Sequence, residues 1–274
     1  MDTSTRYILV PLDFTATSGY ALEHAINIAK VMNLNISLLH IINQQSEEAA
    51  SVSKLNEIAD STLRQHGINV TKITMIGNIF TTISDIASQA DCALVVMKTD
   101  GVKGTQKYTG SRAIKIIAGS KSPFIVVQKP PTKDKFIDIV YPIDYRVENK
   151  EILSYVLHFS KFFEFKLHLI KMHTTDRVFL KNITNNLNFA KSMLETKRLS
   201  FEVFVTNGKL NFGTEINEYS HSINADLIIT QLQRNLTLSK FIFGVKEQKI
   251  IANPYKIPVM CLNPKDLWVF GGFR

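Results

Sequence analysis

The stretches Val10-Pro11-Leu12-Asp13 and Tyr141-Pro142-Ile143-Asp144 each follow a short apolar run, and they lie 131 residues apart in a chain of 274. Other landmarks repeat at nearly the same spacing: Gly77 with Gly208, Gly110 with Gly244, and Pro123 with Pro258. A unit of about 130 residues is too long for a solenoid repeat and has the size of one globular domain. The sequence therefore predicts two related domains in tandem.

The predicted boundaries follow from this repeat. Residues 1–130 form the first domain, 131–135 a linker, 136–264 the second domain, and 265–274 an apolar C-terminal tail. Pro130 and Pro131 begin a polar stretch that resists both helix and sheet, which favours a linker there. The tail carries Trp268, Phe270 and Phe273, which either pack on their own domain or anchor a partner chain.

Short apolar runs alternate with stretches of helical periodicity in both domains. In the first domain, helical stripes run from Leu22 to Met32 and from Val52 to Leu63, and further helices are expected at 79–89 and 111–118. The expected strands are 7–12, 35–42, 70–76, 93–97 and 124–127, and then 136–141, 166–172, 201–205, 227–230 and 259–262. Strands that alternate with helices predict an α/β fold in which each domain has a five-stranded parallel sheet with helices on both faces.

Composition narrows the class of protein. The net charge of +8 arises from 32 Lys and Arg against 24 Asp and Glu, without a basic block, so we do not expect nucleic-acid binding. No apolar stretch reaches the ~20 residues that span a bilayer, so we expect no membrane partner and a soluble, cytoplasmic protein. Cys92 and Cys261 fall at or beside predicted strands of different domains, where free thiols are expected.

Three segments resemble the universal stress protein family: Val10 to Thr15, the segment around Gly77, and Met97 to Ser111. The resemblance covers nearly the whole chain, twice, and implies a Rossmann-like sheet. Nucleotide-binding members carry Gly, two residues, Gly, nine residues, then Gly with Ser or Thr, because phosphate must approach bare backbone N–H groups at a helix N-terminus. Here Lys98 replaces the first glycine, and only eight residues separate Gly101 from Gly110.

The resemblance also implies roles for an ATP-like nucleotide in the first domain. Asp13 would lie near the adenosine, Ile41 and Met97 against the base, and Gly101, Gly104, Gly110 and Ser111 at the phosphates, with Mg as the accompanying ion. Each role has an alternative. Asp13 can instead cap backbone N–H groups, and Ile41 and Met97 can simply be core residues. Lys98, Lys103, Lys107, Arg112 and Lys115 either assist phosphate binding or are solvated surface cations.

The second domain departs further from the nucleotide pattern. Gln231 and Arg234 stand at the first two glycine positions, and Val245 follows Gly244 in place of Ser or Thr. Bulky side chains there block the approach of phosphate to the backbone. Asp144 keeps the carboxylate at the strand end, which alone identifies no site. We therefore expect a scaffold domain without the nucleotide motif.

The chain carries no nucleophile elbow, P-loop lysine motif or zinc-ligand spacing, so no catalytic residue and no metal site are assigned. His168 and His173 are expected on opposite faces of one strand, which argues against shared metal ligation. The leading hypothesis is a non-enzymatic stress-response or signalling module that acts through protein interaction. The alternative is an ATP-binding sensor or slow ATPase that uses the first domain.

Three kinds of partner are expected. The last strands, 124–127 and 259–262, would pair within one chain and remove two exposed sheet edges. A homo-oligomer and an unidentified protein partner remain open.

Overall fold

The computed structural model describes residues 6–15, 17–99, 109–231 and 245–263. In the first half the elements are β1 (Tyr7–Pro11), α1 (Gly19–Met32), β2 (Asn35–Ile42), the 3-10 helix η2 (Gln45–Glu47), α2 (Glu48–His66), β3 (Val70–Ile76), α3 (Ile79–Ala87), β4 (Cys92–Lys98), α4 (Thr109–Gly119) and β5 (Phe124–Val127). The second half repeats the order with β6 (Asp138–Ile143), α5 (Asn149–Phe159), β7 (Lys166–Lys171), α6 (Arg177–Thr196), β8 (Phe201–Val205), α7 (Phe212–Ser222), β9 (Leu227–Gln231), α8 (Val245–Ile251) and β10 (Val259–Leu262).

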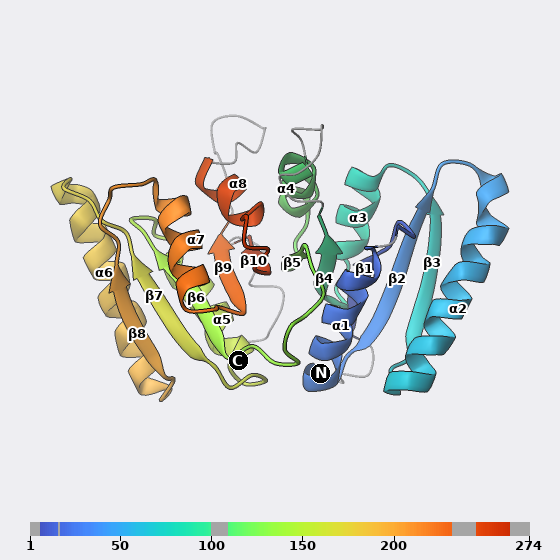
Figure 1. Ribbon diagram of the computed structural model, residues 1–274, viewed down its shortest axis with the longest axis horizontal. Helices are drawn as coiled ribbons and strands as arrows, with labels where there is room; N and C mark the ends of the chain where they lie inside the picture. The colour runs from blue at the N-terminus through green and yellow to red at the C-terminus, as the bar shows by residue number, and fades with distance from the viewer. Residues whose placement is uncertain (1–5, 16, 100–108, 232–244, 264–274) are drawn as a thin grey trace.

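All ten strands belong to one sheet, in the order β3-β2-β1-β4-β5-β10-β9-β6-β7-β8 (Figure 1). Pairing is parallel within each half, and the two halves meet where β5 and β10 run antiparallel, with Ile125 opposite Met260. The predicted α/β class is confirmed, with parallel five-stranded units on each side of this seam. The two units merge into a single continuous sheet through β5 and β10, the last strands of the two halves.

Side-chain alternation along the strands produces two buried cores, one on each face of the sheet. In β1, Ile8 and Val10 enter one core and Leu9 enters the other. The first core is covered by α1, α2, α5 and α6, and the second by α3, α4, α7 and α8. Both cores cross the seam between the halves, and α4 contacts α8 there (Figure 1).

Local sequence explains where several elements begin and end. Asn78, Asp176 and Asn211 cap helices α3, α6 and α7, because each side chain accepts hydrogen bonds from backbone N–H groups of the first turn. Gly67 ends α2 in the left-handed conformation at φ 69°, which glycine adopts without strain. β6 begins at Asp138, two residues later than predicted, because Phe136 packs into the core ahead of the strand.

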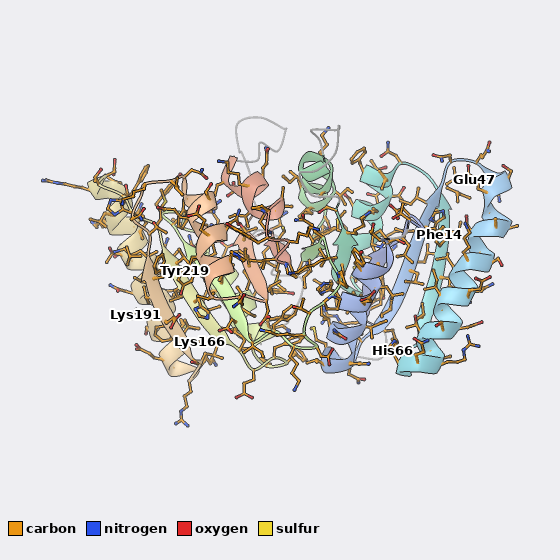
Figure 2. All side chains as sticks on the ribbon, in the orientation of Figure 1. Phe14, Glu47, His66, Lys166, Lys191 and Tyr219 are labelled. Carbon is orange, nitrogen blue, oxygen red and sulfur yellow. The ribbon has the colours of Figure 1, made fainter. Side chains whose placement is uncertain are left out.

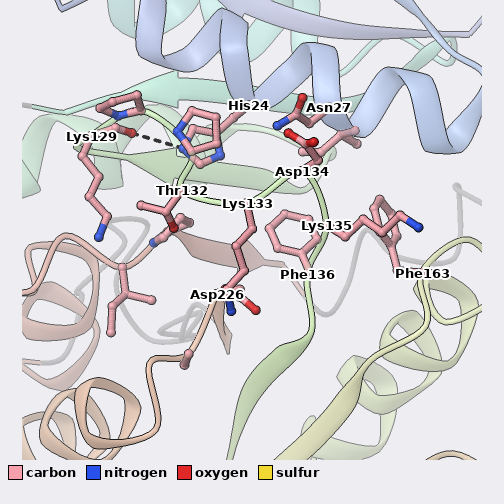
Figure 3. Close-up of a pocket in the computed structure, with 16 residues that line it drawn as sticks. His24, Asn27, Lys129, Thr132, Lys133, Asp134, Lys135, Phe136, Phe163 and Asp226 are labelled. Carbon is pink, nitrogen blue, oxygen red and sulfur yellow. Dashed lines mark hydrogen bonds and ion pairs between the residues drawn. The ribbon is translucent and has the colours of Figure 1, made fainter.

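The segment between the halves is attached to both of them (Figure 3). His24 Nε2 of α1 lies 3.1 Å from the carbonyl oxygen of Lys129, and Lys133 Nζ lies 2.7 Å from Asp226 Oδ1. Asp226 also accepts a hydrogen bond from the Ile137 N–H at 2.8 Å. The cavity beside this segment has a volume of about 40 Å³, far below the several hundred Å³ of an ordinary ligand pocket.

Within the described residues, no helix is both long and apolar enough to cross a membrane. Cys92 and Cys261 are buried and free. The predicted tail with Trp268, Phe270 and Phe273 lies outside the described residues.

Candidate functional site

In open parallel sheets, ligands bind beyond the carboxyl ends of the strands at the point where strand order reverses. β1 lies between β2 and β4, and β6 lies between β7 and β9, so each half has one such point. Asp13 follows β1 and Asp144 follows β6. These two carboxylates occupy equivalent places, and their surroundings differ.

Asp13 is exposed at the end of β1 and bonds mainly to its own loop. Its Oδ1 accepts hydrogen bonds from the Thr15 N–H at 3.0 Å and from Thr15 Oγ1 at 2.7 Å. Partial burial raises the pKa of Asp13, but the Thr15 hydrogen bonds and the positive charge of Lys98 outweigh it, so the pKa lies below its ordinary value. Asp13 is therefore a surface carboxylate that is charged at neutral pH, and it also stabilises its turn.

Phe14, labelled in Figure 2, follows Asp13 in the chain and forms an aromatic contact. Its φ of 55° is unusual for a residue with a large side chain. The ring lies 4.1 Å from the His40 ring, and Lys54 Nζ lies 5.2 Å from the Phe14 ring centroid. His40 is itself fixed, with Nδ1 2.7 Å from the carbonyl oxygen of Leu12. The turn after β1 therefore places a carboxylate next to an aromatic surface.

The other predicted residues of the first site divide into three pairs. Met97 is buried in the second core, and Ile41 is partly buried against it, so both have the packing expected of core residues. The backbones of Gly110 and Ser111 form the first turn of α4. Gly101 and Gly104 lie outside the described residues. Contact of these six residues with a nucleotide stays a prediction.

Asp144 is enclosed by charged side chains of its own half. Lys246 Nζ lies 2.6 Å and Arg146 Nη2 2.7 Å from Asp144 Oδ2. Arg146 Nη1 also lies 3.0 Å from Glu247 Oε1, and Lys246 Nζ lies 3.3 Å from the same oxygen. We call these four residues the Asp144 cluster. Two carboxylates and two cations neutralise one another within it.

Because the carboxylates of the Asp144 cluster are buried, the stability of the fold depends on their ion pairs. Asp144 is 2% exposed and Glu247 is 1% exposed. Burial would raise the pKa of Asp144, but Lys246 and Arg146 hold it well below its ordinary value. Removing one partner would leave a buried charge uncompensated.

Neutral side chains complete the enclosure of the Asp144 cluster. Asn149 Nδ2 donates to Asp144 Oδ1 at 2.9 Å, and Asn186 Nδ2 donates to the Asp144 carbonyl at 2.8 Å. With its amide oxygen oriented toward the guanidinium, Gln231 accepts a hydrogen bond from the Arg146 Nε–H at 2.9 Å. The guanidinium thus lies between the carboxylate that follows β6 and the last residue of β9.

A model of the universal stress protein family matches residues 5–128. This range holds all five strands of the first half together with Asp13 and the first turn of α4. The first half of the chain is a universal stress protein domain. The second half repeats its strand order, 3-2-1-4-5 in the first half corresponding to 8-7-6-9-10 in the second.

Solved structures show the same fold over the full chain. A universal stress protein from Archaeoglobus fulgidus matches with a TM-score of 0.73 and 16% identity, covering 95% of this chain and 97% of its own. A functionally unknown protein from Pseudomonas aeruginosa matches with a TM-score of 0.70 and 17% identity, covering 97% of this chain and 95% of its own. No curated protein matches this sequence.

Sequence reasoning about this universal stress protein fold found Asp13, Asp144 and Gln231 but missed Arg146, Lys246 and Glu247. One signal was available. Arg146 stands 131 residues after Thr15, so a cation replaces the hydroxyl that bonds to Asp13 in the first half. Among the described residues, no group of three or more His, Cys, Asp or Glu is arranged to hold a metal ion.

Proposed function

We propose that this chain is a non-enzymatic stress-response module that acts in the cytoplasm through protein interaction, with its second half as a scaffold. The observation that carries the proposal is the Asp144 cluster. In this half of the fold, the place beyond the strands where a ligand would bind is filled by the chain's own charges. The free, buried Cys92 and Cys261 fit a reducing compartment.

An exposed apolar surface lies next to the Asp144 cluster and supports a role in protein interaction. It comprises Tyr145, Val147, Val178, Phe179 and Leu180, which we call the α6 surface. Tyr145 stacks on Phe179 with ring centroids 4.2 Å apart. Val147 is 74% exposed and Val178 is 67% exposed. Adjacent exposed apolar side chains of this kind mark interaction sites on soluble domains.

A site-specific cross-linking experiment tests the protein-interaction role. A photo-reactive phenylalanine analogue replaces Val147 in the full chain, and the matched control carries it at Leu63, an exposed residue of α2 in the other half. We expect one discrete cross-linked species from the Val147 position under stress and none from Leu63. Equal cross-linking from both positions, or none from Val147, would contradict the role of the α6 surface.

The geometry at Asp13 favours a second candidate function, an ATP-binding sensor or slow ATPase that uses the first half. Asp13 is exposed and charged, and the Phe14 ring beside it offers an aromatic surface to a base. The residues present suit a nucleotide with Mg only in part, because Lys98 takes a glycine position in the phosphate-binding pattern. Asp13 would accept hydrogen bonds from the nucleoside, and the backbone N–H groups of Gly110 and Ser111 would meet the phosphates.

Titration of ATP, with and without magnesium, separates the two candidates. A nucleotide sensor binds ATP saturably, and Asp13→Ala weakens that binding at least tenfold. A separate assay measures phosphate release from ATP. For the non-enzymatic module, both the unmodified chain and Asp13→Ala release phosphate at the background rate. Turnover that Asp13→Ala abolishes would overturn the non-enzymatic assignment.

A further inference from the structure

Strand β8 ends the ten-stranded sheet and exposes apolar side chains along its free edge. It pairs with β7 on one side, with His168 opposite Glu202 and Leu169 opposite Val203. Val203, Phe204 and Val205 are 38%, 40% and 51% exposed. A regular edge strand with adjacent exposed apolar residues is a template for pairing with another strand.

The inner side of β8 is firmly attached. Glu202 lies 2.5 Å from Lys166 Nζ, and its Oε1 accepts a hydrogen bond from the Tyr219 hydroxyl at 3.1 Å. The same oxygen lies 2.7 Å from His168 Nδ1. Phe204 stacks on Tyr219 with ring centroids 4.3 Å apart, and Figure 2 shows Lys166 and Tyr219 beside this strand. β8 is therefore preorganised, so pairing with it costs little further ordering.

The backbone of β8 determines which residues can pair outward. The Leu167 N–H donates to the Ser200 carbonyl, and the Thr206 N–H donates to the Lys171 carbonyl, so the even-numbered residues bond to β7. In a parallel pair, the alternate residues point their N–H and C=O groups away from that neighbour. Phe201, Val203 and Val205 therefore present their backbone groups at the free edge.

The equivalent edge strand in the first half, β3, also exposes apolar residues, Met75 and Ile76 at its end, but it carries an exposed cation as well. β3 ends the sheet at the other side, and exposed Lys72 lies in the middle of it. Lysine on an edge strand opposes pairing with another chain. Lys72 stands 131 residues before Val203, so the two halves carry a cation and a valine at the same place. The charged residue of β8, Glu202, is instead held by partners within its own half.

We propose that β8 is a dimerisation edge that pairs antiparallel with β8 of a second copy of this chain, about a two-fold axis at Val203. This register places Val203 opposite Val203, and Phe201 opposite Val205, so the outward backbone groups meet in three pairs with about six hydrogen bonds. Glu202 then lies opposite Phe204, and no like charges face each other. The inference holds whether or not the first half binds a nucleotide.

The seam between the halves already contains this kind of junction, which favours a second copy over an unrelated peptide. β5 and β10 are equivalent strands of the two halves, they pair antiparallel, and α4 contacts α8 across them. β8 is flanked in the same way by α6 on one face and α7 on the other. A β8 pair would extend the sheet from ten strands to twenty by repeating the chain's own mode of association.

Analytical ultracentrifugation of the full chain between about 1 and 100 µM tests the proposal, and circular dichroism confirms that each variant is folded. Val203→Pro removes an outward N–H without breaking a bond to β7, and Lys72→Pro makes the matched change on β3. Val203→Lys is a second variant that keeps the backbone intact. We expect a dimer for the unmodified chain and for Lys72→Pro, and at least a tenfold rise in dissociation constant for both Val203 variants.

Three results would overturn the dimerisation edge. The first is an unmodified chain that stays monomeric throughout this concentration range. That result would count against the dimer even if the monomer bound an added peptide with the sequence of residues 200–206. The second is a dimer that survives in Val203→Lys. The third is a folded Lys72→Pro variant that loses the dimer as fully as Val203→Pro.

Discussion

Lys246 Nζ lies 2.6 Å from Asp144 Oδ2, although the two residues are 102 positions apart in the chain. The fold brings them together because α8 begins beyond the end of β9 and Asp144 follows the neighbouring strand β6. Asp13 holds the equivalent place in the first half, is exposed, and bonds to Thr15 of its own turn. One fold thus presents the same carboxylate enclosed in one half and accessible in the other.

Arg146→Ala tests the energetic importance of the Asp144 cluster. It leaves Asp144 and Glu247 buried beside a single cation, and we expect a loss of about 3–5 kcal/mol in the free energy of unfolding. Urea unfolding of Arg146→Ala and of Thr15→Ala, the equivalent position in the first half, measures the difference. Thr15→Ala should cost about 1 kcal/mol. Equal losses in the two variants would mean that the cluster is not a buried ionic network.

The pH dependence of stability follows from the lowered pKa of Asp144. Unfolded Asp has a pKa of about 3.9, so the unfolded chain binds this proton first as the pH falls. The stabilisation from Asp144 is fully present above that value and is lost progressively at lower pH. Denaturant unfolding at a series of pH values from about 6 to 2 should therefore show a loss of stability that begins near pH 4 and grows as the pH falls. The side chain in Asp144→Asn does not titrate in this pH range. If the stability of that variant fell equally steeply with pH, Asp144 would not be the source of the acid loss.

Gly213 tests the close contact between α7 and α8. A Cβ added at Gly213 would lie 2.9 Å from the Lys246 carbonyl oxygen and 3.2 Å from its Cα, and backbone cannot move aside easily. We expect Gly213→Ala to lower the free energy of unfolding by about 1–3 kcal/mol. Gly19→Ala is the matched control, because no atom lies within 4 Å of the added Cβ. If the midpoint of thermal unfolding of Gly213→Ala were equal to or higher than that of Gly19→Ala, the close contact between α7 and α8 would be disproved.

Both cysteines should be inert in the folded protein. Burial raises the pKa of Cys92 to about 11 and raises that of Cys261 well above its ordinary value, so little thiolate forms at pH 8. A colorimetric thiol reagent should react with both thiols in denaturant and with neither within minutes under native conditions. Rapid native labelling of either one would show that its strand opens readily.

The fold was predictable because its signals are local and occur twice. The apolar run before Val10-Pro11-Leu12-Asp13 identifies β1, and the 131-residue repeat identifies β6. The strand order around the seam is harder to predict from the sequence, because hydrophobic periodicity does not indicate which sheet edges pair. Pattern reasoning also placed the start of β6 at Phe136, an apolar residue that packs without belonging to the strand.

The Asp144 cluster was not predictable in the same way. Arg146, Lys246 and Glu247 look like ordinary surface charges in the sequence, because charged residues are mostly exposed. Their burial depends on strand order and on the close approach of α7 to α8, which brings together residues about 100 positions apart. Met97 was identified from the sequence, but its role was not. Its position in a strand fits a core residue and a ligand contact equally well.

The number of ATP molecules bound per chain tests the central claim most directly. Equilibrium dialysis against millimolar ATP with magnesium would be compared between the unmodified chain and Gly110→Trp, which obstructs the first turn of α4. The account predicts at most one ATP per chain and none in Gly110→Trp, because the second half is closed by the Asp144 cluster. Two ATP molecules per chain, or one that persists in Gly110→Trp, would contradict it.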